Sequence, residues 1–185
     1  GCTAAARTRG RGLEWRRMAV EGTPADWVRV ALHRFGLEPM WVLSGVNDGG
    51  NLGADVHHSG TVAAVREAVL HGWTGIAFSQ YKRKGMPIDW AEVTTRVLPV
   101  LRDLIARPIE AGVFWSVNLP HLEPGSPAPK SVLCPMDISP LPLSVRQEGE
   151  HLHYNGDYHG RRRTPGGDVD VCFSGSIAVT QLRLA

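Results

Sequence analysis

The stretch from residue 43 to residue 69, LSGVNDGGNLGADVHHSGTVAAVREAV, holds the residue types best suited to bind an anion. It carries a set of glycines that remove side-chain bulk and allow positive φ angles: Gly45, Gly49, Gly50 and Gly53. Backbone N–H groups in such a segment can turn inward and surround a negative charge. The stretch therefore predicts a phosphate-binding loop, with an ordinary structural turn as the alternative.

Polar side chains in the same stretch add chemistry that glycine alone lacks. Ser59, Gly60 and Thr61 stand at the start of an apolar helical repeat, where free N–H groups and the helix dipole attract phosphate. Asn47 and Asn51 offer amide oxygens that suit a hard cation or a phosphate contact. The segment lacks the lysine of a Walker A loop and the glycine spacing of a dinucleotide-binding loop. A phosphate-binding loop of another kind and an ordinary structural turn therefore both stay open.

Helices and short apolar strands alternate around this loop and must position it. Apolar spacing and cap signals predict three helices, over residues 23–36, 61–70 and 88–107. Short apolar runs predict three buried strands, over residues 40–43, 74–79 and 112–120. Pro99 lies inside the third helix and predicts a kink or a break there. The alternation indicates an α/β fold with a doubly wound parallel sheet, in which ligands bind beyond the carboxyl ends of the strands.

The second half of the chain has a different texture. Beyond Pro120, prolines are frequent, and short β-like pieces at 131–136 and 176–184 alternate with turn residues. This pattern predicts hairpins and arms rather than further βαβ units.

The domain organisation follows from this change in sequence pattern beyond Pro120. Residues 1–12 contain three arginines and no acidic residue, and we expect them to form a loose basic tail. Residues 13–185 are expected to form a single domain, with an α/β core over 13–119 and a β-rich arm with the C-terminal strand over 120–185.

Composition excludes several classes of protein. The chain has 185 residues, of which 43% are hydrophobic, and a net charge of +2, which is typical of one soluble globular domain. Such a small net charge gives no electrostatic reason to expect a nucleic-acid or membrane partner. No apolar run is long enough for a membrane span, and the three cysteines are too scattered for a disulfide framework. We expect a cytoplasmic protein.

Four segments resemble, in the same order, the SurE family of 5'/3'-nucleotidases: residues 21–32, 44–68, 117–120 and 166–182. The resemblance runs from about Leu13 to Leu184, and the segment SGVNDGGNLGADVHHSGTVAAVREA is its most specific part. It implies a metal-dependent phosphomonoesterase that hydrolyses nucleoside monophosphates. It also implies a Rossmann-like fold with a protruding hairpin and a homodimer or tetramer that exchanges C-terminal arms.

The same resemblance implies roles for individual residues. Asn47 would be a ligand of a divalent cation, magnesium or manganese. Asn51 and Asp55 would be catalytic, and the phosphate would bind to Asn51, Ser59, Gly60 and Thr61.

One departure from the family affects the metal site. Family members begin with a strand, a double-aspartate turn, a helix and a second strand, and we find no counterpart of these elements here. We therefore expect an N-terminally incomplete member with impaired activity, because a divalent cation prefers about six oxygen ligands. The alternatives are an inactive assembly or nucleotide-binding module, and a subunit whose aspartates come from another chain. Recruitment of Asp48 and Asp55 as substitute ligands is a further hypothesis.

Other polar residues have both a functional and a structural explanation. Adjacent His57 and His58, or His151 and His153 on one strand face, could ligate a metal, but we favour packing or a substrate contact for His58 and a solvated hairpin for His151 and His153. The arginines at 161–163 could meet a nucleotide or an acidic partner, or form an exposed turn. Glu67 could act as a general acid, but we expect it in a surface pair. Asp168 and Asp170 are expected in a turn or a subunit contact.

Overall fold

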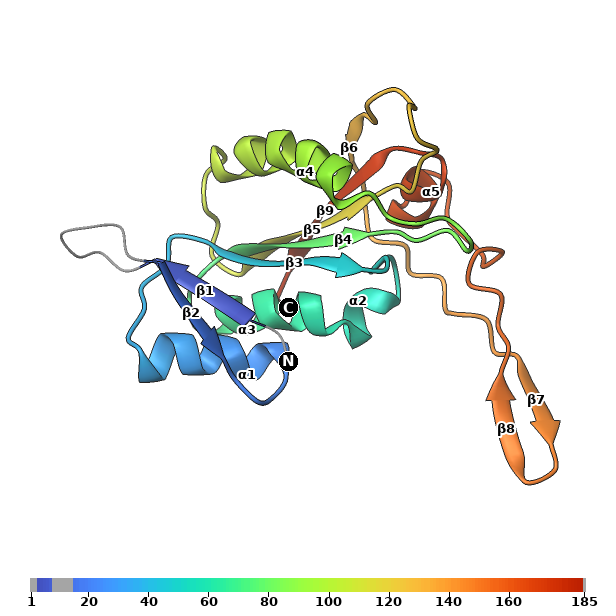
Figure 1. Cartoon of the computed structure of the whole chain (residues 1–185), viewed down its shortest axis with the longest axis horizontal. Helices are drawn as coiled ribbons and strands as arrows, with labels where there is room; N and C mark the ends of the chain where they lie inside the picture. The colour runs from blue at the N-terminus through green and yellow to red at the C-terminus, as the bar shows by residue number, and fades with distance from the viewer. Residues whose placement is uncertain (1–2, 8–14, 185) are drawn as a thin grey trace.

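The core of the molecule is a five-stranded sheet in the order β3-β4-β5-β9-β6 (Figure 1). The computed structural model describes residues 3–7 and 15–184. The strands of the sheet are β3 (Val42–Asp48), β4 (Gly75–Gln80), β5 (Val113–Leu119), β6 (Ser131–Leu133) and β9 (Ile177–Arg183). β3, β4 and β5 are parallel, β9 is antiparallel to β5, and β6 is parallel to β9. The α/β fold with a mostly parallel sheet is confirmed.

Helices cover both faces of this sheet (Figure 1). α1 (Pro24–Arg29) and α3 (Gly60–Leu70) lie on one face, and α4 (Trp90–Ile105) lies on the other. The core between α4 and the sheet consists of buried apolar side chains, among them Ile76, Phe78, Val100, Leu104, Trp115 and Val117. The core under α3 consists of Val62, Val65, Val69, Ala77 and Phe114. Burial of these side chains is the main favourable contribution to folding.

The helices begin within two residues of their predicted starts. Thr23 caps α1 in a capping box with Asp26, and a short π-helical turn (Val30–Arg34) extends the helix to Gly36, which has φ +57°. Ser59 caps α3 by accepting from Val62 N at 3.1 Å. Asp89 caps α4, which continues through Pro99, so the predicted break is absent. The packing of α4 against the sheet offsets the lost hydrogen bond.

The first strand differs from its prediction. The apolar run at 40–43 is not a complete buried strand, because Met40 is exposed and the strand continues through Ser44 and Gly45 to Asp48. Gly45 makes this continuation possible, since a Cβ at this position would lie 2.2 Å from Phe78 O on β4. The first third of the predicted loop is therefore strand.

The β-rich half forms the predicted arms. β7 (Val145–Glu148) and β8 (His151–Tyr154) form an exposed hairpin that projects from the body (Figure 1). α5 (Asp168–Phe173) follows, and β9 returns the chain to the sheet.

The N-terminal region contains one further hairpin, in which β1 (Thr3–Arg7) pairs with β2 (Trp15–Ala19). The predicted tail at residues 1–12 thus has a paired strand where the sequence suggests loose chain, and the rest of that segment lies outside the described residues. Across residues 3–7 and 15–184, none of the helices has the length and apolar character needed to cross a bilayer.

Candidate functional site

The loop that follows β3 crosses the carboxyl ends of the parallel strands. Gly49 N donates to Gln80 O, at the end of β4, at 3.0 Å. The backbone then descends to Asn51, turns at Gly53 and enters α2 (Asp55–His58), which leads to Ser59 and α3. This is the edge where loops and helix N-termini of such sheets converge on ligands.

Asn51 is bound to the sheet from several directions. Asn118, at the end of β5, accepts from Asn51 N at 2.8 Å and donates to Asn51 O at 3.0 Å. The Asn51 side chain donates to Ser79 Oγ at 2.7 Å. Both asparagines are buried, so these hydrogen bonds replace water and fix the loop backbone.

Gly53 is bound to α5. Its φ of +55° requires glycine, and its N–H donates to Asp168 Oδ2 at 2.8 Å. Asp168 Oδ1 accepts from Asp137 N and Val169 N at 2.9 and 2.8 Å, so one carboxylate joins three chain segments. Burial raises the pKa of Asp168, and its N–H donors oppose that shift.

Asp55 is bound to the segment after the hairpin. Its Oδ2 accepts from Tyr158 Oη at 2.6 Å, from Arg161 Nη1 at 3.2 Å and from Leu52 N at 3.2 Å. We call Asn51–Asp55 the held segment, because its polar groups are bonded to the body of the molecule.

Residues on either side of the held segment have polar atoms without a hydrogen-bond partner among the described residues. Asn47 donates to Gly49 O at 2.9 Å, but its Oδ1 has no hydrogen-bond partner among the described residues. The backbone N–H groups of Gly60 and Thr61, before the first bonded turn of α3, and the Thr61 hydroxyl also have none within the described chain. We call Asn47, Gly60 and Thr61 the open groups.

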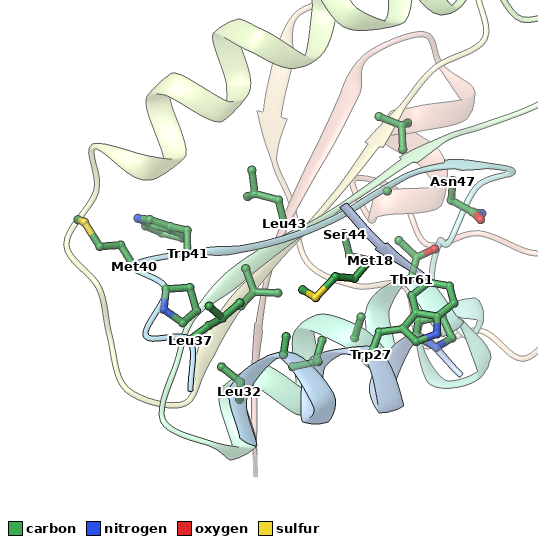
Figure 2. Close-up of a pocket in the computed structure, with 18 of the residues that line it drawn as sticks. Met18, Trp27, Leu32, Leu37, Met40, Trp41, Leu43, Ser44, Asn47 and Thr61 are labelled. Atoms are coloured by element: carbon green, nitrogen blue, oxygen red, sulfur yellow. The ribbon is translucent and has the colours of Figure 1, made fainter. Parts of the chain in front are cut away.

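A groove of about 820 Å³ runs along the outer edge of β3 and ends at Asn47 and Thr61 (Figure 2). Its floor is apolar and includes Leu32, Leu37 and Trp41. Trp27 lies near Thr61 in Figure 2, and its Nε1 is buried without a partner in the described structure. The groove therefore combines an apolar body with a polar end that has donors and an acceptor to offer.

Comparison with known proteins identifies the family. The sequence profile described as "Survival protein SurE" matches residues 3–136. The chain is 50% identical over 166 residues to alr3139, a candidate 5'-nucleotidase of Nostoc sp., and the match covers 90% of this chain and 74% of that protein. The chain belongs to the SurE family.

Further SurE proteins agree with this assignment. A protein of Paramagnetospirillum magneticum named 5'-nucleotidase SurE is 34% identical over 186 residues, covering 93% of this chain and 68% of that protein. The crystal structure of the SurE protein of Aquifex aeolicus superposes with a TM-score of 0.75 at 23% identity, covering all of this chain and 75% of that one. This structure supports the fold alone.

The metal expected from the SurE resemblance finds few ligands here. Asn47 Oδ1 is available, whereas Asp48 pairs with Lys82 at 3.0 Å and Asp55 is engaged by Arg161. In the part of the chain that the structure describes, no group of three or more His, Cys, Asp or Glu side chains is arranged to hold a metal ion. These residues alone do not fit a divalent cation, and recruitment of Asp48 and Asp55 is not supported.

The histidine candidates lie apart from the loop's hydrogen-bond network. His57 and His58 are exposed on α2. His151 and His153 are exposed on the hairpin, with ring centroids 6.5 Å apart.

Glu67 is buried and joins α3 to α1, because its Oε1 lies 2.7 Å from Arg29 Nε. It is therefore an interhelix contact, where the sequence predicts a surface pair.

Sequence reasoning missed the most connected groups of the site. The sequence predicts the arginines at 161–163 as one group, either an exposed turn or a contact for a nucleotide or an acidic partner, yet Arg161 is buried and its two neighbours are exposed. It predicts Asp168 in a turn or a subunit contact, yet Asp168 is buried and accepts from Gly53 N. Both partners lie more than a hundred positions from the loop in sequence, so no local pattern indicates these contacts.

Proposed function

We propose that this chain is a phosphatase-type hydrolase that removes phosphate from nucleoside 5'- and 3'-monophosphates. Its SurE relatives bear the name 5'-nucleotidase, which supports the 5' substrates, and the family resemblance adds the 3' substrates. The observation that carries the proposal is the position of Asn47 and Thr61 at the end of the groove, with the unbonded N–H of Gly60 directly before Thr61.

The open groups are suited to hold a phosphoryl group. The N–H groups of Gly60 and Thr61 point out of the N-terminus of an eleven-residue helix, where the dipole favours an anion. The Thr61 hydroxyl adds a polar atom, and Asn47 lines the same groove. Ser59 Oγ accepts from Val62 N, so only its hydroxyl hydrogen is left to donate to a phosphate. Fixed donors of this kind stabilise charge that develops during phosphoryl transfer.

We assign supporting roles to Asn51 and Asp55. The sequence predicts both as catalytic and Asn51 as a phosphate contact, but their side chains are engaged with Ser79 and Arg161. In our proposal they act by holding the loop in the shape that presents the open groups. Pre-organisation of this kind lowers the cost of ordering the site around the substrate.

The proposal includes a divalent cation, magnesium or manganese, for which Asn47 is the one ligand that we assign among the described residues. When bound, such an ion would neutralise phosphate charge and lower the pKa of a coordinated water. Asn47 would supply one ligand, and the others would come from outside the described residues. The proposal also includes a cytoplasmic homodimer or tetramer, which the family resemblance implies and sedimentation analysis can test.

A nucleotide-binding or assembly module without catalysis is the second candidate. The small number of cation ligands among the described residues favours it. It predicts binding of AMP without turnover.

The experiment is a phosphate-release assay with AMP, with and without manganese, on the chain and on two variants. With manganese present, Asn47→Ala should lower the rate at least tenfold, because the amide oxygen that would ligate the cation is lost. His57→Ala, on the exposed face of α2, is the matched control and should keep the parental rate. Binding of AMP with no phosphate release under any condition would favour the second candidate, and absence of both would contradict the two candidates together.

A further inference from the structure

Tyr158 and Arg161, in the segment after the hairpin, form polar contacts with the held segment. Neither residue has a role in the proposed catalysis or phosphate binding. We propose that Arg161 and Tyr158 are positioning residues, which set the conformation of the loop. The inference concerns the site of the proposed function, and its phosphate readout rests on that function.

Arg161 contacts two different parts of the held segment. Its Nη1 lies 3.2 Å from Asp55 Oδ2, and its Nη2 donates to Leu52 O at 3.2 Å. The guanidinium group therefore joins a side chain and a backbone carbonyl across one turn. Only 3% of the Arg161 side chain is exposed, so water cannot replace these bonds. The planar fork of arginine suits such a double contact, whereas the single ammonium of lysine does not.

Tyr158 completes the contact from the same segment. Its hydroxyl donates to Asp55 Oδ2 at 2.6 Å, and the Arg161 guanidinium carbon lies 4.3 Å from the centre of its ring. The ring thus supports the cation while the hydroxyl shares the carboxylate. Burial and the Asp55 carboxylate raise the pKa of Tyr158, which keeps the hydroxyl a donor across the physiological range.

The contact continues into the open groups. Asp55 O accepts from Ser59 N at 2.9 Å, and Ser59 is the N-cap of α3, directly before Gly60 and Thr61. A change in the orientation of Asp55 therefore shifts the start of α3. The path runs from Tyr158 and Arg161 through Asp55 and Ser59 to Gly60 and Thr61.

Arg161 also has an unusual feature that marks it as more than a surface ion pair. Its Nε is buried and has no hydrogen-bond partner within the described residues. Burying a charged group with a missing bond is costly, so its position must be compensated by the bonds to the loop. An exposed arginine two residues along, Arg163, pairs loosely with Asp170 at 3.5 Å instead.

The test compares Arg161→Met, Arg161→Lys and Tyr158→Phe with the exposed-neighbour control Arg162→Met. Backbone hydrogen exchange is measured for Leu52–Thr61 and, as a reference for global stability, for β4 and β5. Affinity for inorganic phosphate is measured by calorimetry on the same proteins.

We expect Arg161→Met to speed exchange in Leu52–Thr61 by about tenfold, and Tyr158→Phe by about threefold, with β4 and β5 unchanged. Arg161→Lys should restore part of the protection, and Arg162→Met should match the parent. Phosphate affinity should fall in the same order. If Arg161→Met does not fold, Arg161→Lys and Tyr158→Phe carry the test.

Parental exchange at the loop in the Arg161 and Tyr158 variants would overturn the inference. A uniform rise over β4 and β5 as well would reduce the contact to general stability and would overturn it too. If the parent chain binds no phosphate, the proposed function fails, while the exchange data still decide whether Arg161 positions the loop.

Discussion

The held segment and the open groups belong to one loop but use their polar atoms in opposite ways. In Asn51–Asp55, polar atoms are bonded to β4, β5, α5 and the segment after the hairpin. In Asn47, Gly60 and Thr61, donors and an acceptor remain without partners in the described structure. Support and recognition are therefore assigned to different residues of the same motif. Removing the supports should cost stability, whereas removing the open groups should cost phosphate binding.

The largest effect is expected at Asp168. Asp168→Ala removes the acceptor of three backbone N–H groups, which leaves buried donors unpaired, and should lower the free energy of unfolding by about 3 kcal/mol or more. Urea unfolding of the variant measures this loss. Asp170→Ala, at a partly exposed position in the same helix, is the control and should cost less than about 1 kcal/mol. Equal losses at the two positions would contradict the assignment of support to Asp168.

A smaller loss is expected at Asn118. Asn118→Ala deletes both hydrogen bonds from the buried end of β5 to the Asn51 backbone. It should lower the free energy of unfolding, measured in urea, by about 2 kcal/mol. Phosphate affinity should fall as well, because Asn51 then lacks its anchor. A variant that loses stability but keeps parental phosphate affinity would show that the held segment does not shape the open groups.

The next effect is a pH-dependent loss of stability at Glu67 on α3, the helix that carries Gly60 and Thr61. The hydrogen bond from Arg29 lowers the pKa of Glu67, an effect that burial opposes. A carboxyl group whose pKa is lowered by folding adds stability above its ordinary pKa, and this contribution is lost as the pH falls. Glu67→Gln should therefore destabilise the chain by about 1 kcal/mol at pH 7, and less below about pH 4. Thermal unfolding at several pH values measures the difference, and a difference independent of pH would refute the ion-pair explanation.

The smallest effect on stability is expected at Thr61. Thr61→Val keeps the side-chain shape and removes one hydroxyl without a partner in the described chain, so unfolding should change by less than about 0.5 kcal/mol. The dissociation constant for inorganic phosphate should nevertheless rise about fivefold. Thr94→Val on α4 is the matched control and should leave phosphate binding unchanged. A loss of stability without a loss of affinity would place Thr61 among the supports.

The sequence predicts the scaffold of this molecule well, because its signals are local. The three helices begin near their predicted starts, where Thr23, Ser59 and Asp89 are the N-caps, and the strands around 75–80 and 113–119 follow their apolar runs. The extension of β3 through Ser44 and Gly45 is not predicted, since it depends on the close approach of Phe78 on a neighbouring strand. Tertiary pairing there overrides a local turn signal.

The candidate site is predictable only in its position. The glycines and the Ser-Gly-Thr segment locate it, but they do not distinguish Asn47, which lines the groove, from Asn51, which turns into the sheet. The partners that make this distinction, such as Asn118 and Arg161, are remote in sequence and of ordinary type. Their roles follow from the three-dimensional arrangement alone.

A crystal structure of the chain with AMP tests the central claim most directly. We expect the phosphate at the N-terminus of α3, within hydrogen-bond distance of Gly60 N, Thr61 N and the Thr61 hydroxyl, while Asn51 stays bonded to Asn118 and Ser79. Phosphate bound elsewhere, or bound by Asn51 after it has left its partners, would contradict the division of the loop into supporting and binding residues.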